Sequence, residues 1–273
     1  MGNKTIKISY LISNMKPKKK MRISIFSLKK ALFFAFLFCA IGVKSIAQTA
    51  TASTRSSFRA RTNTQYTAHS ELFAEFRPLL QNVPARFTAH LTQISESFKP
   101  YTDAEVTLSL MIDGKQAWQQ TQIKPVAEGI YRFPVKSEIA GTGTVTISLK
   151  MLTYSEQFII ENVTIYADEA TALSKQSKAP EEKPVDEITY YKEKSWLETF
   201  ATAPVGKVKK NIVVPRSAIQ TEKGATYVFV QCDPEHFRKQ PVKLGKSLSG
   251  NTLTVIGLKL GDRIVTLGAD KIK

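Results

Sequence analysis

The sequence predicts an all-β protein of two domains behind an N-terminal export signal. Three observations support this: short runs of alternating apolar and polar residues, turn residues between these runs, and a basic, apolar segment at the start of the chain. The chain has 273 residues, of which 42% are hydrophobic. This length and composition are sufficient for two small cores of about a hundred residues each.

The first 47 residues have the layout of a signal peptide with a basic leader. Lys29 and Lys30 precede the apolar run 31–43, and Ser45-Ile46-Ala47 supplies small residues at the −3 and −1 positions of a cleavage site. The run is shorter than the roughly twenty residues that span a bilayer. We therefore expect export to the periplasm, with inner-membrane association if the signal stays uncleaved. Translation starts at Met1 or at Met21.

The net charge of +16 does not indicate a nucleic-acid-binding protein. Residues 1–48 hold ten of the 39 Lys and Arg residues and no acidic residue. The remainder holds 29 basic and 23 acidic residues, a net charge of +6. No concentrated basic footprint is left in this count, so we expect no nucleic-acid partner.

After a flexible lead-in over residues 48–65, residues 66–167 are predicted to form an immunoglobulin-like β-sandwich. Asp113-Gly114 is a turn of the type that closes hairpins, and Pro134 favours an edge strand. The expected strands lie in seven short runs: 72–76, 87–91, 106–112, 115–123, 129–136, 143–152 and 154–166.

Residues 168–187 are charged, contain two prolines and are predicted to be a linker. Residues 188–273 then form a second β domain, with one or two helical turns around Trp196. Its strands include 213–214, 227–230 and 264–267, and Gly257 and Gly261 bracket a turn. The expected mature chain has a single cysteine, Cys232, so both domains must rely on hydrophobic cores without an intramolecular disulfide.

Three spaced blocks at the end of the chain carry a resemblance to a known family. They are Val213-Val214-Pro215-Arg216-Ser217-Ala218, then Tyr227-Val228-Phe229-Val230, then residues 257–269, GLKLGDRIVTLGA. This part resembles the membrane-proximal end of periplasmic adaptor (membrane fusion) subunits of RND-type efflux pumps, in the HlyD, CzcB and CusB family. The resemblance implies that this C-terminal part is a β-barrel or membrane-proximal-type β domain. It also implies a connector that docks on an inner-membrane pump and self-associates as a ring. It would dock through the turns containing Pro215, Ala218, Gly257, Gly261 and Asp262.

The blocks 70–79, 86–92 and 98–100 resemble the N-terminal β domain of some heavy-metal adaptors. The chain departs from the family after Val205, where a lipoyl-like module and an α-helical hairpin should follow. Only residues 206–212 separate Val205 from the next block, and no heptad pattern occurs. Without a hairpin, contact with an outer-membrane channel is not expected.

Four side chains are candidate ligands for a transient heavy-metal ion: His69 and His90 on neighbouring predicted strands, and Cys232 and His236 in one loop. Solvent-facing or hydrogen-bonded histidines are the more common reading of the first pair, and two ligands make a weak site. No resident cofactor and no catalysis are expected, since phosphate loops, nucleophile triads and paired carboxylates are absent from the sequence. Two alternatives to the adaptor remain: a free-standing periplasmic metal-binding or chaperone protein, and a non-functional remnant of an adaptor gene.

Overall fold

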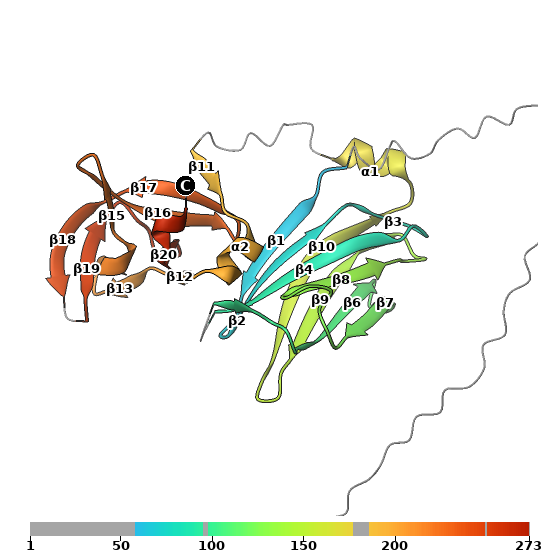
Figure 1. The fold of residues 1–273 in the computed structure, drawn as a ribbon. Coiled ribbons are helices and arrows are strands. Elements are labelled where there is room, and N and C mark those ends of the chain that lie inside the picture. Colours follow the sequence, from blue (N-terminus) through green and yellow to red (C-terminus); the bar gives the residue numbers. More distant parts are fainter. Residues whose placement is uncertain (1–57, 95–97, 177–185, 249, 273) are drawn as a thin grey trace, which may run out of the picture. The chain divides into compact units, whose positions relative to one another are not determined.

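A computed structural model describes residues 58–94, 98–176, 186–248 and 250–272. The all-β fold class is confirmed, since the strands build four sheets and the helices are short (Figure 1). The predicted signal peptide lies outside the described residues. Among those that are described, no helix is long and apolar enough to cross a membrane.

Two five-stranded sheets form the N-terminal part. The first contains β1 (Arg61–Tyr66), β2 (Ser70–Phe76), β4 (Ala85–Gln93), β5 (Lys99–Pro100) and β8 (Ile130–Val135). The second has the order β3 (Leu79–Leu80), β10 (Ser155–Tyr166), β9 (Gly141–Lys150), β6 (Glu105–Ile112) and β7 (Lys115–Gln122). All pairings in both sheets are antiparallel except that between β10 and β3.

Both sheets contribute to one sandwich core. Leu72 and Phe87 from the first sheet and Val106 and Leu149 from the second are completely buried in the same apolar cluster. In β6 every second side chain is buried, as expected for a strand with one face on a core. Strand β2 differs, because six of its seven residues are buried and its second face is therefore covered too.

The turn between β6 and β7 has the predicted form. Asp113 and Gly114 both have positive φ, 49° and 74°, which is the signature of the two-residue turn that matches the twist of a hairpin. Pro134 also lies where its missing amide is tolerated, because β8 pairs with β4 and with no other described strand.

Two expected boundaries need correction. Residues 61–65 were expected in the flexible lead-in, but they belong to β1, which is antiparallel to β2. The side chains of this strand are largely exposed and show no apolar alternation. Main-chain hydrogen bonds to β2 hold it in place, so the sequence pattern does not reveal it. The expected linker begins with a helix, α1 (Glu169–Lys175), whose first turn is capped by Asp168 accepting from the Thr171 amide at 2.7 Å. Residues 177–185 of that linker lie outside the described residues.

The C-terminal part contains a six-stranded and a four-stranded sheet. The larger consists of β11 (Glu187–Thr189), β17 (His236–Pro241), β16 (Ala225–Asp233), β20 (Arg263–Leu267) and β12 (Ala201–Pro204), with β15 (Gln220–Glu222) pairing with β16. The smaller has the order β13 (Gly206–Val208), β14 (Asn211–Pro215), β19 (Thr252–Ile256) and β18 (Lys243–Leu248). Three short helices complete it: α2 (Lys192–Leu197) and the 3₁₀ helices Arg216–Ala218 and Ala269–Lys271.

Two apolar clusters support these sheets. Val214, Val228, Val255 and Ile264 join the two C-terminal sheets in one core. A second cluster is aromatic, and its members Tyr190, Phe200, Phe229 and Phe237 pack together with Phe98, which follows β4 in the sandwich. Aromatic packing therefore links the end of the sandwich to the larger C-terminal sheet.

Two glycines of the sandwich should respond differently to alanine. A Cβ at Gly143 would lie 1.8 Å from the Met111 carbonyl oxygen, so β6 and β9 would have to separate. A Cβ at Gly114 would meet nothing within 4 Å, so Gly114→Ala costs only the left-handed backbone strain of about 1 kcal/mol. We expect Gly143→Ala to lower the free energy of unfolding, measured in urea, by at least twice as much. An equal or smaller loss at Gly143 would contradict this packing.

Candidate functional site

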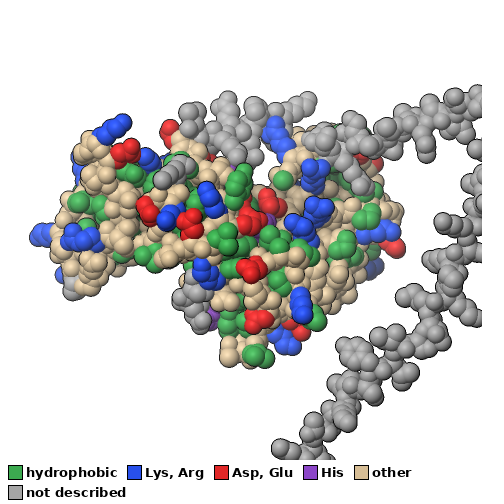
Figure 2. All heavy atoms as spheres, viewed as in Figure 1, with side chains coloured by type: hydrophobic (Ala, Val, Ile, Leu, Met, Phe, Trp, Pro, Cys, Tyr) green, Lys and Arg blue, Asp and Glu red, His purple; other side chains and the backbone are tan. Residues whose placement is uncertain are grey.

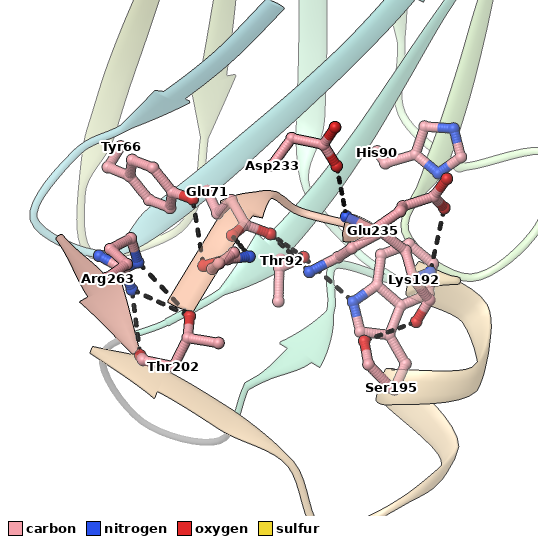
Figure 3. Close-up of polar contacts among 12 residues, drawn as sticks. Tyr66, Glu71, His90, Thr92, Lys192, Ser195, Thr202, Asp233, Glu235 and Arg263 are labelled. Carbon is pink, nitrogen blue, oxygen red and sulfur yellow. Dashed lines mark hydrogen bonds and ion pairs between the residues drawn. The ribbon is translucent and has the colours of Figure 1, made fainter. Parts of the chain in front are cut away.

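A buried ion pair lies where α2 packs against the sandwich (Figure 3). Glu71, in β2, and Lys192, the first residue of α2, have side chains that are 0% and 1% exposed. The Lys192 Nζ donates to Glu71 Oε1 at 2.5 Å. The two residues are 121 positions apart in the chain, so this pair exists only when both parts of the protein are folded and in contact.

Uncharged side chains make the remaining contacts of the Glu71 carboxylate and the Lys192 ammonium. Gln231, in β16, donates to Glu71 Oε2 at 3.4 Å, and the Thr92 hydroxyl donates to Oε1 at 3.4 Å. Thr92 in turn accepts from the Trp196 indole N–H at 3.0 Å. The Lys192 ammonium also lies 4.7 Å from the centre of the Phe98 ring, a cation–π distance. We call these residues, with the ion pair, the polar joint.

His90 forms a second group of contacts beside the polar joint. Its Nε2 lies 3.2 Å from Glu75 Oε2, and its Nδ1 lies 3.9 Å from Glu193 Oε1 in α2. The ring is buried against Phe73 and Trp196. The hydrogen bond from His90 is the main reason that the pKa of Glu75 is below its usual value, while burial acts in the opposite direction.

Glu235, in the turn between β16 and β17, caps the start of α2. Its Oε1 accepts from the Lys192 amide at 3.1 Å, and its carbonyl oxygen accepts from the Tyr190 amide at 2.7 Å. Burial raises the pKa of the Glu235 carboxyl, and the carboxylates of Glu75 and Glu193 add to this, while the Lys192 amide and His90 oppose it. Glu235 is therefore a charged group that the folded state accommodates poorly.

The structure does not bring His69 and His90 together as one metal site. His69 stacks on Tyr154, with ring centres 4.4 Å apart. The register partner of His90 is Phe73, four residues from His69, which is about 13 Å at strand spacing. The two imidazoles thus have separate protein neighbours. Their strands are adjacent, but the two residues are offset by four positions along the strand direction.

Cys232 and His236 are engaged by other groups as well. The His236 Nδ1 lies 2.8 Å from Asp233 Oδ2, within the β16–β17 hairpin. Burial, helped by Glu187, raises the pKa of the Cys232 thiol to about 11, so the metal-binding thiolate is scarce at neutral pH. Throughout the described part of the chain, no three His, Cys, Asp or Glu side chains gather as a metal site.

Of the expected docking residues, Pro215 precedes the 3₁₀ helix Arg216–Ala218 and Ala218 is its last residue. Ala218 is 0% exposed and belongs to the core shared by the two C-terminal sheets. Its side chain therefore cannot contact a partner, and this residue shapes the turn from inside. The sequence pattern could not distinguish a conformational role from a surface role at this position.

The turn before β20 is exposed and internally braced. Gly257 and Gly261 have φ of 117° and 100°, as the predicted turn requires. Asp262 closes it, because its Oδ2 accepts from the Lys259 amide at 2.9 Å and its own amide donates to the Lys259 carbonyl oxygen at 3.1 Å. Its carbonyl oxygen accepts from the Val205 amide, which ties the turn to the chain before β13. The turn 257–262 is thus a preformed surface feature.

Residues 212–273 match the family model of the CzcB C-terminal circularly permuted SH3-like domain. The matched segment begins in β14 and contains the whole chain from there to the end, including the turn 257–262. No curated protein and no solved structure matches the chain significantly. Strands β11, β12 and β13 precede the matched segment and pair with β17, β20 and β14, so earlier residues complete its sheets.

Sequence reasoning missed the polar joint. Glu71 lies in a strand whose alternate residues are apolar, and this pattern gives no sign that Glu71 is buried as well. Lys192 opens a short charged helix with no pattern that would indicate burial. The nearby Trp196 was the one available signal that this helix packs against something.

Removing one partner of the buried pair should be costly. Lys192→Met leaves the Glu71 carboxylate buried without its counter-ion, and we expect a loss of about 3–5 kcal/mol in unfolding free energy. The double variant Glu71→Gln/Lys192→Met should recover a large part of this loss. Lys239→Met is the matched control, because Lys239 and Glu222 pair at 2.6 Å while both are about half exposed, and it should cost under about 1 kcal/mol. Additive single-variant losses in the double-mutant cycle would contradict the coupling.

Glu235→Gln should stabilise the protein in a pH-dependent way. The glutamine keeps the acceptor for the Lys192 amide and removes the charge. Because the folded-state pKa of Glu235 is raised, wild type loses stability relative to the variant as pH rises through that pKa. We expect a gain of up to about 1 kcal/mol at pH 8 and none below the ordinary pKa of the carboxyl. Urea unfolding of both proteins across this pH range measures the difference in unfolding free energy. A difference that is largest at acid pH would contradict the prediction.

Proposed function

We propose that the chain is a shortened periplasmic adaptor (membrane fusion) subunit of an RND-type efflux system that exports heavy-metal or other cations. The observation that carries this proposal is the match of residues 212–273 to the CzcB C-terminal domain. The resemblance of residues 70–100 to the N-terminal domain of heavy-metal adaptors supports it from the other end of the chain.

The shortened form is supported by the connection between β13 and β14. Val208 pairs with Asn211, so Lys209 and Lys210 alone form the turn at the point where the family resemblance places the lipoyl-like module and helical hairpin. The sheet is continuous through this turn, because β14 continues into pairing with β19. A protein that lost the inserted modules at this point would keep an intact C-terminal β domain.

The proposed mechanism is mechanical and not catalytic. The braced turn 257–262 would dock on the periplasmic face of an inner-membrane pump, and sister copies would associate as a ring. The polar joint would hold the sandwich at a fixed place on the docking domain, so that force or movement in the pump is passed on. Contact with an outer-membrane channel is not part of the proposal, because the hairpin that would reach it is missing.

The location that fits this role is the periplasm, reached through the N-terminal signal. A C-terminal tag at Lys273, with crosslinking of cell envelopes, tests partner and location together. Recovery of an inner-membrane RND pump would support the adaptor. Abundant protein without a pump would favour the free-standing binding protein, and barely detectable protein would favour the remnant.

The turn 257–262 should be needed for pump recovery. Gly261→Ala strains a residue with φ of 100°, and Asp262→Ala removes the acceptor for the Lys259 amide. We expect the double variant to fold, with at least a fivefold loss of crosslinked pump. Gly224→Ala is the matched control, since Gly224 has φ of 81° in a different turn of this domain and a Cβ there meets nothing within 4 Å. Unchanged pump recovery in the double variant would remove this turn from the docking surface.

A further inference from the structure

The four-stranded C-terminal sheet carries charge of only one sign. Its four strands lie in residues 206–218 and 243–261, which contain no Asp or Glu, and Asp262 at the end of the turn 257–262 is the first acidic residue that follows. They contain seven basic residues, namely Lys207, Lys209, Lys210, Arg216, Lys243, Lys246 and Lys259. The modest charge of the chain outside the leader therefore hides a strong local excess.

No acidic side chain in the described part of the chain neutralises these seven basic side chains. Each of the seven residues is exposed, and none takes part in an ion pair among the described residues. Other cations of the same domain do have acidic partners, as Lys239 has Glu222 and Lys271 has Glu198. Figure 2 shows basic side chains over the part that Figure 1 labels β18 and β19.

Apolar side chains are exposed among these charges. Val208, Leu244, Ile256 and Leu260 are 46%, 49%, 72% and 62% exposed. Ile256 is the register partner of Lys243, and Val208 lies between Lys207 and Lys209 in sequence. We call the seven basic and four apolar residues the basic sheet face.

The charges are spread over the sheet and do not converge on a point. The register places Val208, Ile256 and Lys243 in one row on the outward side of the sheet, while Lys207 and Leu244 lie in the next row, on the side of the buried Val255. Lys207 and Lys243 are on opposite edge strands, about 14 Å apart at normal strand spacing. A single small anion would contact few of them. An extended anionic plane would contact many, and it would also take up the exposed aliphatic side chains.

We propose that the basic sheet face binds the surface of an anionic lipid bilayer. Basic residues near such a surface contribute about 1 kcal/mol each, and aliphatic side chains among them insert at the boundary between headgroups and acyl chains. Six of the seven cations are lysines, which are strongly hydrated point charges, and lysine is depleted in protein–protein interfaces. This favours a lipid surface over an acidic protein, and it does not depend on any pump.

A fluorescent label on the sheet tests the proposal in the full chain. Position 256 would carry an environment-sensitive dye through Ile256→Cys, with Cys39→Ala and Cys232→Ser as background. Vesicles of phosphatidylcholine alone and vesicles with 30% phosphatidylglycerol are compared. We expect a blue shift of the dye on the anionic vesicles only, reduced at 0.5 M salt, where the Debye length falls from about 10 Å toward about 3 Å.

Two controls separate the sheet from the basic leader. A dye at Leu152→Cys, a fully exposed position in the β9–β10 turn, should not shift. The variant Lys207→Gln/Lys209→Gln/Lys246→Gln should weaken the shift at position 256 by about 100-fold in lipid concentration. The variant Lys115→Gln/Lys124→Gln/Lys136→Gln, with the same charge change on the exposed sandwich surface, should leave it unchanged.

Several outcomes would overturn the proposal. If the dye at position 256 does not shift on anionic vesicles, an acidic protein is favoured over a lipid surface as the partner of this face. Equal shifts at 152 and 256 would assign the binding to the leader, and equal shifts on neutral vesicles would remove the electrostatic basis. An unchanged shift in the variant with glutamines at positions 207, 209 and 246 would exclude these lysines.

Discussion

The arrangement of the described chain depends on one constraint, which is that the Glu71 carboxylate and the Lys192 ammonium are both out of water. An isolated buried charge is so unfavourable that each of these residues requires the other in place. Strand β2 has two buried faces because Lys192 of α2 and Gln231 of β16 contact Glu71 on the second one. The short helix α2 in turn gains stability from Trp196 and Lys192 packing there. The sandwich and the C-terminal sheets are therefore linked by a contact that tolerates little sliding.

The surfaces available for partners follow from what the cores use. Ala218 and Val214 belong to the C-terminal core and cannot contact a partner, whereas the turn 257–262 and the outward side chains of the smaller sheet are accessible. The turn is rigid because Asp262 closes it, whereas the lysines around it are long and uncompensated. A preformed turn suits a specific protein contact, and mobile lysines suit a diffuse electrostatic one, so the two surfaces can serve different partners at once.

The sequence predicts this fold where local rules apply. The Asp113-Gly114 hairpin, the strands around Val213, Val228 and Val265, and the glycine-bounded turn all follow from turn chemistry and period-two alternation. Strand β1 escaped because it is held by main-chain hydrogen bonds and has no apolar face. The polar joint could not be predicted, because it joins residues far apart in the chain and no local pattern indicates that a lysine and a glutamate are buried together.

The turn at Lys209 and Lys210 makes the C-terminal domain modular. Its two ends are neighbouring positions of one hairpin, about 5 Å apart, and both lysines are exposed. A long segment with its own ends close together can be spliced in or out at such a point without altering any strand pairing or core contact. A segment inserted at this turn can therefore change in length and structure over evolutionary time without a matching change in the two sheets of the domain.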